Sequence, residues 1–231
     1  VAERSGSLAD HATRLLRNAK LLPAALMARL PFRDIAAQDR FAQEHNILVL
    51  EARDLDSYHH QAGAMMRIAA RARVPLAVAE DAEVVMFRAE IGGEDHFAVL
   101  IGKGADLDAP LVRLHSQCIT GDVLGSLKCD CGDQLQAAMR LMAENGGGVL
   151  IYLAQEGRDI GLLNKMRAYA LQDNGLDTVD ANHALGFDTD ERVFLPAARI
   201  LDALGITRLR LITNNPDKIS QLEQCGIKVE E

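Results

Sequence analysis

The stretch VLIYLAQEGRDIGLLNKMRAYALQ, residues 149–172, decides the fold class of this chain. Residues 149–153 are continuously apolar, which predicts a buried strand, and residues 162–172 have the spacing of a helix. The polar residues 155–161 between them predict a loop at the carboxyl end of the strand. A strand followed by a polar loop and a helix is typical of α/β proteins, in which ligands bind beyond the carboxyl ends of the strands.

The sequence after this stretch repeats the alternation of helix and strand. Asn215 has the residue type of a helix N-cap, and Pro216 suits the first helical position. Gly226 separates this helix from a final strand. We predict an irregular segment at residues 175–190 and a helix at residues 192–204. A strand at residues 209–213 and a short helix at residues 216–224 follow. This alternation predicts an α/β layer structure.

Between residues 74 and 148, the pattern of apolar and turn-forming residues predicts strands and one helix. Gly92-Gly93 predicts a hairpin-like turn between the first two strands. The helix has apolar residues at helical spacing and stops at a run of glycines. The predicted strands cover residues 84–89, 96–102 and 111–115, and the predicted helix covers residues 134–144.

Residues 1–73 have a different texture and predict a mainly helical extension. We expect a domain boundary between this extension, residues 1–73, and a catalytic domain, residues 74–231. The pair His59-His60 is interpreted as exposed surface, because adjacent helical residues point in different directions and cannot share a metal ion easily. In the extension we predict helices at residues 7–20, 34–44 and 56–73, and one short strand at residues 47–50.

Composition and charge narrow the class of protein. Apolar residues make up 48% of the 231 residues, which is enough for a core. The net charge of −8 argues against nucleic acid as a partner, although a few well-placed cations can still bind phosphates. The sequence has no apolar run of membrane-spanning length and no signal-peptide layout. We therefore expect a cytoplasmic protein without a membrane partner, whose cysteines are thiols or metal ligands.

Cys118, Cys129 and Cys131 form a cluster in a loop-rich part of the sequence. Structural zinc sites normally have four ligands, often as two CxxC pairs, whereas three ligands leave one coordination position open for water. The cluster therefore favours a catalytic zinc ion, and three reduced thiols without metal are the alternative. The fourth cysteine, Cys225, has apolar neighbours and is interpreted as an ordinary buried thiol.

Cationic residues that follow strands are candidates for phosphate binding. Arg158 follows the strand at residues 149–153, and its planar guanidinium suits a phosphate. Thr213 and Lys218 flank the turn at the start of a helix, where anions are favoured. The group Asp190-Glu191-Arg192 is interpreted, on composition alone, as the charged first turn of a helix. The chain has no GxxxxGK[ST] motif, which excludes a P-loop protein.

Taken together, these stretches resemble GTP cyclohydrolase II, from about residue 74 to the end of the chain. The stretches that carry the resemblance are RLHSQCITGD at 113–122, SLKCDCG at 126–132, QEGRDIGL at 155–162, NKMRAYALQ at 164–172, NHALGF at 182–187, DER at 190–192 and TNNPDK at 213–218. Residues 1–73 lie outside the resemblance.

The resemblance implies an α/β fold with a mixed-sheet core. It also implies that the protein converts GTP to 2,5-diamino-6-ribosylamino-4(3H)-pyrimidinone 5′-phosphate, formate and pyrophosphate, which is the first step of riboflavin biosynthesis. The implied cofactors are one catalytic Zn²⁺ per subunit and Mg²⁺ with the GTP phosphates, and the implied assembly is a homodimer.

The resemblance also implies roles for single residues. The three clustered cysteines are the zinc ligands, Asp190 is the proton acceptor, Arg192 acts on the α-phosphate, and Tyr169 is a partner in hydrolysis of the ring. Arg192 acts either as a covalent nucleophile or as a stabiliser of charge on the phosphoryl group. The residues implied to contact GTP are Arg113, Leu114, His115, Ser116, Gln117, Gln134, Glu156, Gly157, Arg158, Thr178, Thr213 and Lys218.

Some positions depart from the commoner family pattern. Gln117 stands where Glu is frequent, Ala154 where Arg is expected, and Lys128 where Arg is frequent. These departures bear on affinity for GTP more than on the type of reaction. Two alternatives stay open: an enzyme that stops at a formamidopyrimidine product, and a non-catalytic GTP-binding regulatory protein.

Overall fold

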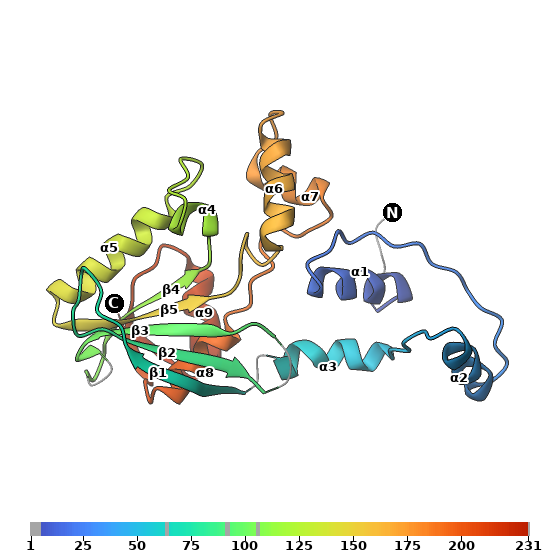
Figure 1. Ribbon diagram of the computed structural model, residues 1–231, viewed down its shortest axis with the longest axis horizontal. Helices are drawn as coiled ribbons and strands as arrows, with labels where there is room; N and C mark the ends of the chain where they lie inside the picture. The colour runs from blue at the N-terminus through green and yellow to red at the C-terminus, as the bar shows by residue number, and fades with distance from the viewer. Residues whose placement is uncertain (1–5, 63–64, 91–92, 105–106, 231) are drawn as a thin grey trace.

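The protein combines a mixed sheet flanked by helices with an N-terminal segment that extends to one side of it (Figure 1). The residues that the computed structural model describes are 6–62, 65–90, 93–104 and 107–230, without the side chains of residues 59–62. The interpretation of the His59-His60 side chains and the turn predicted at Gly92-Gly93 therefore fall wholly or partly outside the described residues.

In the described residues, the sheet has seven strands in the order β1-β2-β3-β5-β4-β6-β7. The strands from β1 to β5 in this order pair antiparallel, whereas β5, β4, β6 and β7 pair in parallel. Parallel strands place their carboxyl ends at the same edge of a sheet, and this edge positions the site described below. The strands are β1 (Met66–Arg73), β2 (Glu83–Ala89), β3 (His96–Gly102), β4 (Leu111–Ser116), β5 (Gly147–Leu153), β6 (Arg208–Leu211) and β7 (Lys228–Glu230).

Helices cover both faces of the sheet and give it two apolar cores. The face covered by α8 (Leu195–Ala203) and α9 (Pro216–Gln224) holds the larger core, with Ile200 and Leu222 fully buried. The opposite face packs against α5 (Cys131–Glu144) through Met142. Because β5 is buried on both faces, its residues 149–153 can be apolar without alternation, as the sequence predicted.

Several predicted elements are confirmed together with the residues that start them. Ser7 caps α1 (Leu8–Asn18), and Asp34 caps α2 (Ile35–Glu44), each by accepting a hydrogen bond from a backbone N–H. Asn215 caps α9 in the same way, with Pro216 in the first turn. The helix predicted for residues 162–172 is α6 (Gly161–Gln172).

The prediction of one helix over residues 56–73 is wrong. The chain forms α3 (Ala52–Ala62) and then the strand β1, which pairs with β2 from Met66 to Arg73 with one irregularity between Ile68 and Ala70. The Ala-rich and Arg-rich composition of β1 favours a helix locally, but pairing with the sheet edge overrides that weak preference. β1 lies on the N-terminal side of the boundary that we expected at residue 73.

Three further predictions need correction. Residues 47–50 are not a strand but an exposed irregular segment, with no strand beside them in the described part of the chain. The segment 175–190 is not wholly irregular, because Asp177 caps a short helix, α7 (Thr178–Ala184). The helix expected from residue 192 begins only at Leu195, so Asp190-Glu191-Arg192 lies before the helix rather than in its first turn.

None of the described helices combines the length and the apolar character of a membrane span.

Candidate active site

One cavity of about 380 Å³ lies beyond the carboxyl ends of the parallel strands β4 and β5. Its walls come from the segments after these strands, from the start of α5, and from α6 and α7. The predicted site residues that line it are Ser116, Gln117, Cys118, Cys129, Cys131, Gly157, Arg158, Tyr169, Thr178 and Arg192. Stretches that are far apart in the sequence therefore meet in one site.

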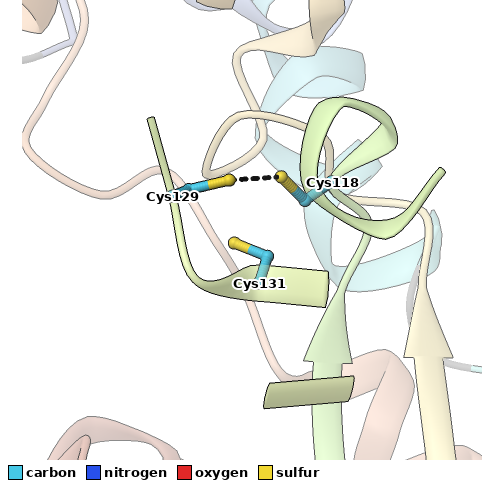
Figure 2. A group of neighbouring side chains, drawn as sticks. All are labelled: Cys118, Cys129 and Cys131. Atoms are coloured by element: carbon cyan, nitrogen blue, oxygen red, sulfur yellow. Dashed lines mark hydrogen bonds between the residues drawn. The ribbon is translucent and has the colours of Figure 1, made fainter. Parts of the chain in front are cut away.

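The three cysteines point toward one another in this cavity (Figure 2). Their sulfur atoms all lie within 4.8 Å of one another, and the Sγ atoms of Cys118 and Cys129 are 3.6 Å apart. Tetrahedral coordination with metal–sulfur bonds of about 2.3 Å places two sulfurs roughly 3.8 Å apart. The cluster thus has the spacing of a three-thiolate metal site.

Two glycines allow the loops of the cluster to approach closely. A Cβ atom at Gly121, in α4 (Ile119–Asp122), would lie 2.9 Å from Sγ of Cys129 and 3.2 Å from Sγ of Cys118. A Cβ atom at Gly132, at the start of α5, would lie 2.3 Å from the carbonyl oxygen of Gly121. A side chain at Gly121 would collide with the sulfur atoms, and a side chain at Gly132 would collide with the backbone of Gly121, so the backbone can approach the cluster this closely only with glycine at both positions.

The acidities of the thiols also fit a bound cation. Burial raises the pKa of the Cys118 thiol, but hydrogen bonds from Lys165 and Thr120 outweigh this effect and lower the pKa overall. Burial, together with the neighbouring Cys118 and Cys129, raises the pKa of Cys131. Three thiolates at this spacing repel one another, and a metal cation at their centre supplies the charge that allows all of them to ionise.

Lys165 was not predicted as a site residue, but it holds the cluster in place. Its ammonium group donates to Sγ of Cys118 at 3.0 Å, to Oγ1 of Thr120 at 2.9 Å and to Oε1 of Glu156 at 2.8 Å. An ammonium has three N–H donors, so these acceptors use all of them. The other carboxylate oxygen of Glu156 accepts from the backbone N–H of Ile119 at 2.7 Å. Lys165 and Glu156 thereby fix the turn that carries Cys118.

A second buried network supports the same turn. Asp122 accepts from the Cys118 backbone N–H at 3.0 Å and from the Tyr152 hydroxyl at 2.8 Å, and its carboxylate lies 3.0 Å from Nε2 of His115. His115, a predicted GTP contact, is thus only 3% exposed and bound to a carboxylate. Asp122 lies in the quoted stretch 113–122, but the sequence alone did not single it out.

Asp190 and Arg192 form a two-point ion pair at the rim of the cavity. Nε of Arg192 donates to Oδ1 of Asp190 at 2.8 Å, NH2 donates to Oδ2, and NH1 lies 3.3 Å from the Ser116 hydroxyl. Burial raises the pKa of Asp190, but the ion pair with Arg192 outweighs it and holds the pKa below its ordinary value. Asp190 is therefore a carboxylate near neutral pH, and Arg192 presents NH1 toward the cavity.

The remaining predicted residues are not among those that line the cavity. Arg113 donates to the carbonyl oxygen of Ile212 and to the side chain of Gln134, and the Thr213 hydroxyl accepts from the backbone N–H of Asn215. The Lys218 ammonium is buried and donates to the backbone of Leu114, whose side chain is part of the main core. Contact between GTP and these side chains requires the bound nucleotide to reach past the described cavity or the side chains to turn.

The sequence contained a signal for Lys165 that the motif pattern did not use. Lys165 precedes Tyr169 by four residues in α6, so both side chains lie on the face of the helix that lines the cavity. Nζ of Lys165 lies 5.7 Å from the centre of the Tyr169 ring, and Nζ of Lys128 lies 5.0 Å from it. Tyr169 therefore has two cations close to its ring and lines the same cavity as the thiol cluster.

The loop between β5 and α6 has unusual backbone geometry. Arg158 and Asp159 have φ angles of 60° and 74°, in the left-handed region that residues with a side chain rarely adopt. Each such residue costs on the order of 1–3 kcal/mol, and it persists where surrounding contacts fix it. The strain lies at the residue predicted to bind phosphate, which is typical of functional sites.

His96 anchors the start of this loop and makes its stability depend on pH. Nδ1 of His96 accepts from the Ala154 backbone N–H at 3.0 Å, and burial lowers the pKa of His96 to about 4. Between about pH 4 and 6.5 the unfolded chain binds a proton that the folded chain does not. We therefore expect acidification through this window to lower the free energy of unfolding, by about 3 kcal/mol at most from His96 alone.

Urea unfolding at pH 6.5 and 4.5 tests this expectation. His96→Asn keeps a hydrogen-bond acceptor for the Ala154 N–H but does not titrate, so its stability should fall less than that of the unchanged chain. Equal losses in the two proteins would contradict the role of His96.

Comparisons with known proteins agree with this geometry. A family model described as GTP cyclohydrolase II matches residues 66–231. A GTP cyclohydrolase-2 from Azospirillum brasilense is 50% identical over 98% of this chain and 58% of its own length. A riboflavin biosynthesis protein RibBA from Chlamydia trachomatis is 43% identical over 95% of this chain and 53% of its own length. A GTP cyclohydrolase-2 from Cronobacter sakazakii is 55% identical over 60% of this chain and 71% of its own length.

The matches to two of these relatives cover only part of the relatives' length. The chain spans slightly more than half of the length of the Azospirillum and Chlamydia relatives. The family match covers the whole sheet, from β1 to β7, and all the segments that line the cavity. The chain belongs to the GTP cyclohydrolase II family.

Proposed function

We propose that this chain hydrolyses GTP to 2,5-diamino-6-ribosylamino-4(3H)-pyrimidinone 5′-phosphate, formate and pyrophosphate. The observation that carries the proposal is the single cavity that joins the three-cysteine cluster to Tyr169 and Arg192. The cysteines suit chemistry on the guanine ring, and the Asp190–Arg192 pair suits chemistry on a phosphate. Chemistry on the ring and chemistry on the phosphate are both needed for a reaction that releases formate and pyrophosphate from one nucleotide.

Cys118, Cys129 and Cys131 would hold one zinc ion per subunit, with the fourth position open. A zinc ion bound there would supply Lewis-acid activation of water. Sulfur ligands are softer than magnesium prefers, so we assign Mg²⁺ to the GTP phosphates and not to the cysteines.

The protein residues have separable roles in the proposed reaction. Tyr169 orients a water or transfers a proton during release of formate, since its ring lines the cavity beside the cluster. Arg192 stabilises negative charge on the transferring phosphoryl group, because Asp190 occupies Nε and NH2 and leaves NH1 for the substrate. Arg158 and Thr178 line the same cavity and would contact GTP.

The proposal extends to assembly, location and organisation. We propose a homodimer in the cytoplasm, where reduced thiols can serve as metal ligands. We also propose that residues 1–73 and 74–231 act as an extension and a catalytic domain, with β1 of the extension as the edge strand of the catalytic sheet.

Product analysis tests the proposed activity. The chain is supplied with GTP, zinc and magnesium, and formate, pyrophosphate and the mass of the nucleotide product are measured. We expect formate and the diaminopyrimidine product. A product that retains the formyl group would favour the formamidopyrimidine alternative, and GTP binding without turnover by the zinc-loaded protein would favour the regulatory alternative.

The Lys165 ammonium gives a prediction about zinc affinity. Three thiolates and one Zn²⁺ carry a net negative charge in a site where Cys118 is only 4% exposed, and Lys165 offsets that charge while bonding to the Cys118 sulfur. Loss of such a supporting partner typically weakens metal binding by about 10–100-fold. We expect this loss for Lys165→Met, measured by competition for zinc with a chelator.

Lys128→Met is the matched control for that measurement. Lys128 is also a cation beside Tyr169, but its ammonium pairs with Asp173 at 2.5 Å and its side chain is 41% exposed. Its removal should leave the zinc affinity nearly unchanged. Equal affinities of Lys165→Met and the unchanged protein would contradict the supporting role of Lys165.

A further inference from the structure

One short segment of the N-terminal extension lies against two loops that border the active-site cavity. We define the arm as residues 17–23, which comprise the end of α1 and the segment after it. The arm contacts two loops of the catalytic domain. The Arg158 loop is residues 154–160, between β5 and α6, and the Arg192 loop is residues 185–194, between α7 and α8. In Figure 1 the helix α1 lies on the side of the molecule where α6 and α7 stand.

The arm binds the Arg158 loop at its strained residues. Nζ of Lys20 donates to the carbonyl oxygen of Asp159 at 2.9 Å and forms an ion pair with the Asp159 carboxylate. In return, the Asn164 side chain donates to the carbonyl oxygen of Lys20 at 2.8 Å. Asp159 directly follows Arg158, and both have left-handed φ angles. Lys20 therefore binds both the backbone and the side chain of a residue whose conformation requires outside support.

The arm binds the Arg192 loop as well. NH2 of Arg17 donates to the carbonyl oxygen of Gly186 at 2.9 Å, and its guanidinium lies 3.6 Å from the carboxylate of Asp188 and 3.7 Å from that of Glu191. Glu191 lies between Asp190 and Arg192 in the sequence. A single arginine of the arm thus contacts the Arg192 loop at Gly186, at Asp188 and at Glu191, which lies within the Asp190–Arg192 pair.

Two glycines of the catalytic domain, Gly161 and Gly186, allow the arm to approach closely because they have no side chain. A Cβ atom at Gly161 would lie 3.1 Å from Cβ of Lys20, and a Cβ atom at Gly186 would lie 2.9 Å from Cγ of Pro23. Both glycines also have left-handed φ angles, of 81° and 85°. The catalytic domain therefore presents a surface that fits the arm closely at two separate points.

The two loops are also joined to each other. NH1 of Arg158 donates to the carbonyl oxygen of Thr189 at 3.1 Å, and the backbone N–H of Glu191 donates to the carbonyl oxygen of Arg158 at 3.3 Å. The arm lies against both loops, so a displacement of either one is opposed by the same segment.

We propose that the arm is a positioning element of the active site, in which Lys20 and Arg17 hold the Arg158 and Arg192 loops in the geometry that binds and cleaves the triphosphate of GTP. This inference rests on the proposed function and adds to it a role for residues outside the family match, which begins at residue 66. Lys20 and Arg17 act through the loops, and they do not contact the cavity that holds the three cysteines.

Point variants of the whole chain test the proposal. Lys20→Met removes the ammonium but keeps a long side chain, and Asp159→Asn removes the carboxylate at a position where Asn tolerates the left-handed backbone. We expect each variant to lower kcat/KM for GTP by about 10–100-fold, because small displacements of positioned groups have effects of this size. The double variant should lose little more than either single variant, because both remove one interaction.

Arg14→Met is the matched control. Arg14 lies in the same helix as Arg17 and pairs with Asp56 at 2.8 Å, which is a contact within the extension. Its removal costs an ion pair without touching either loop, so kcat/KM should stay within about twofold of the unchanged protein. A loss in this control equal to that in Lys20→Met would show general destabilisation and would overturn the proposal.

Hydrogen exchange separates this proposal from the proposed function. In Lys20→Met, backbone exchange should rise in residues 154–160 and 185–194 and stay unchanged in α5. This readout needs no turnover, so it tests the arm even if the unchanged chain releases no formate. Unchanged exchange in both loops would overturn the proposal, and so would faster exchange with unchanged kcat/KM, because the loops would then need no positioning by the arm.

Discussion

Cys129→Ser is expected to remove the zinc ion and, with it, the release of formate. The Cys129 sulfur lies 3.6 Å from that of Cys118, and Cys129 lines the cavity. A serine hydroxyl is a harder and more weakly acidic ligand, which leaves only two thiolates at a site that needs three protein ligands. Metal activation of water contributes several kcal/mol to such reactions, so formate release should fall by about a thousandfold or more.

Zinc content and formate release should be measured on the same preparation. Cys225→Ser is the matched control, because Cys225 is partly buried against the main core and lies outside the three-cysteine group. This control should keep both zinc and activity. Full formate release by Cys129→Ser protein that contains no zinc would contradict the assignment of the cluster.

Arg192→Lys is expected to lower pyrophosphate release by about 10²–10³-fold, as loss of one positioned donor does at other sites of developing charge. Lysine keeps the positive charge but lacks the planar fork that binds Asp190 at two points and presents NH1 beside Ser116. The geometry, more than the charge, should therefore decide the rate. Pyrophosphate and formate are measured separately, since the phosphate and ring steps use different residues.

Asp190→Asn is a useful companion to Arg192→Lys. Asn can still accept a hydrogen bond from the guanidinium but no longer pairs with it as a carboxylate, so pyrophosphate release should fall less than in Arg192→Lys if Asp190 mainly orients Arg192. A larger loss in Asp190→Asn would favour a base that assists Arg192 as a nucleophile. Unchanged pyrophosphate release in Arg192→Lys would contradict the role of the guanidinium altogether.

Much of the fold followed from local sequence patterns. The continuous apolar run at residues 149–153 predicted a strand buried on both faces, and β5 is the strand between helices on either side. Asn215 was predicted as an N-cap from its residue type, because capping is a local interaction. The helices predicted from residues 7 and 34 also begin there, where the structure shows Ser7 and Asp34 as caps. The wrong helix at residues 66–73 shows the limit, since pairing with β2 is a contact that the local pattern does not contain.

The site was predictable where it consists of motifs and not where it consists of long-range contacts. The cysteine cluster, Tyr169 and Arg192 were expected from their stretches, and they line one cavity. The contacts of Lys20 with Asp159 join residues that are 139 positions apart, and no spacing rule predicts them. Lys165 was predictable only in part. Its helical spacing from Tyr169 can be read in the sequence, whereas its hydrogen bond to Cys118 cannot.

X-ray absorption at the zinc edge tests the three-thiolate site most directly, on protein that converts GTP. We expect about three sulfur ligands at roughly 2.3 Å and one oxygen or nitrogen ligand at roughly 2.0 Å, because the three cysteines leave the fourth position open. Addition of GTP should change the light ligand and leave the sulfurs in place. Four sulfur ligands, or a zinc ion without sulfur ligands in active protein, would contradict a catalytic zinc held by Cys118, Cys129 and Cys131.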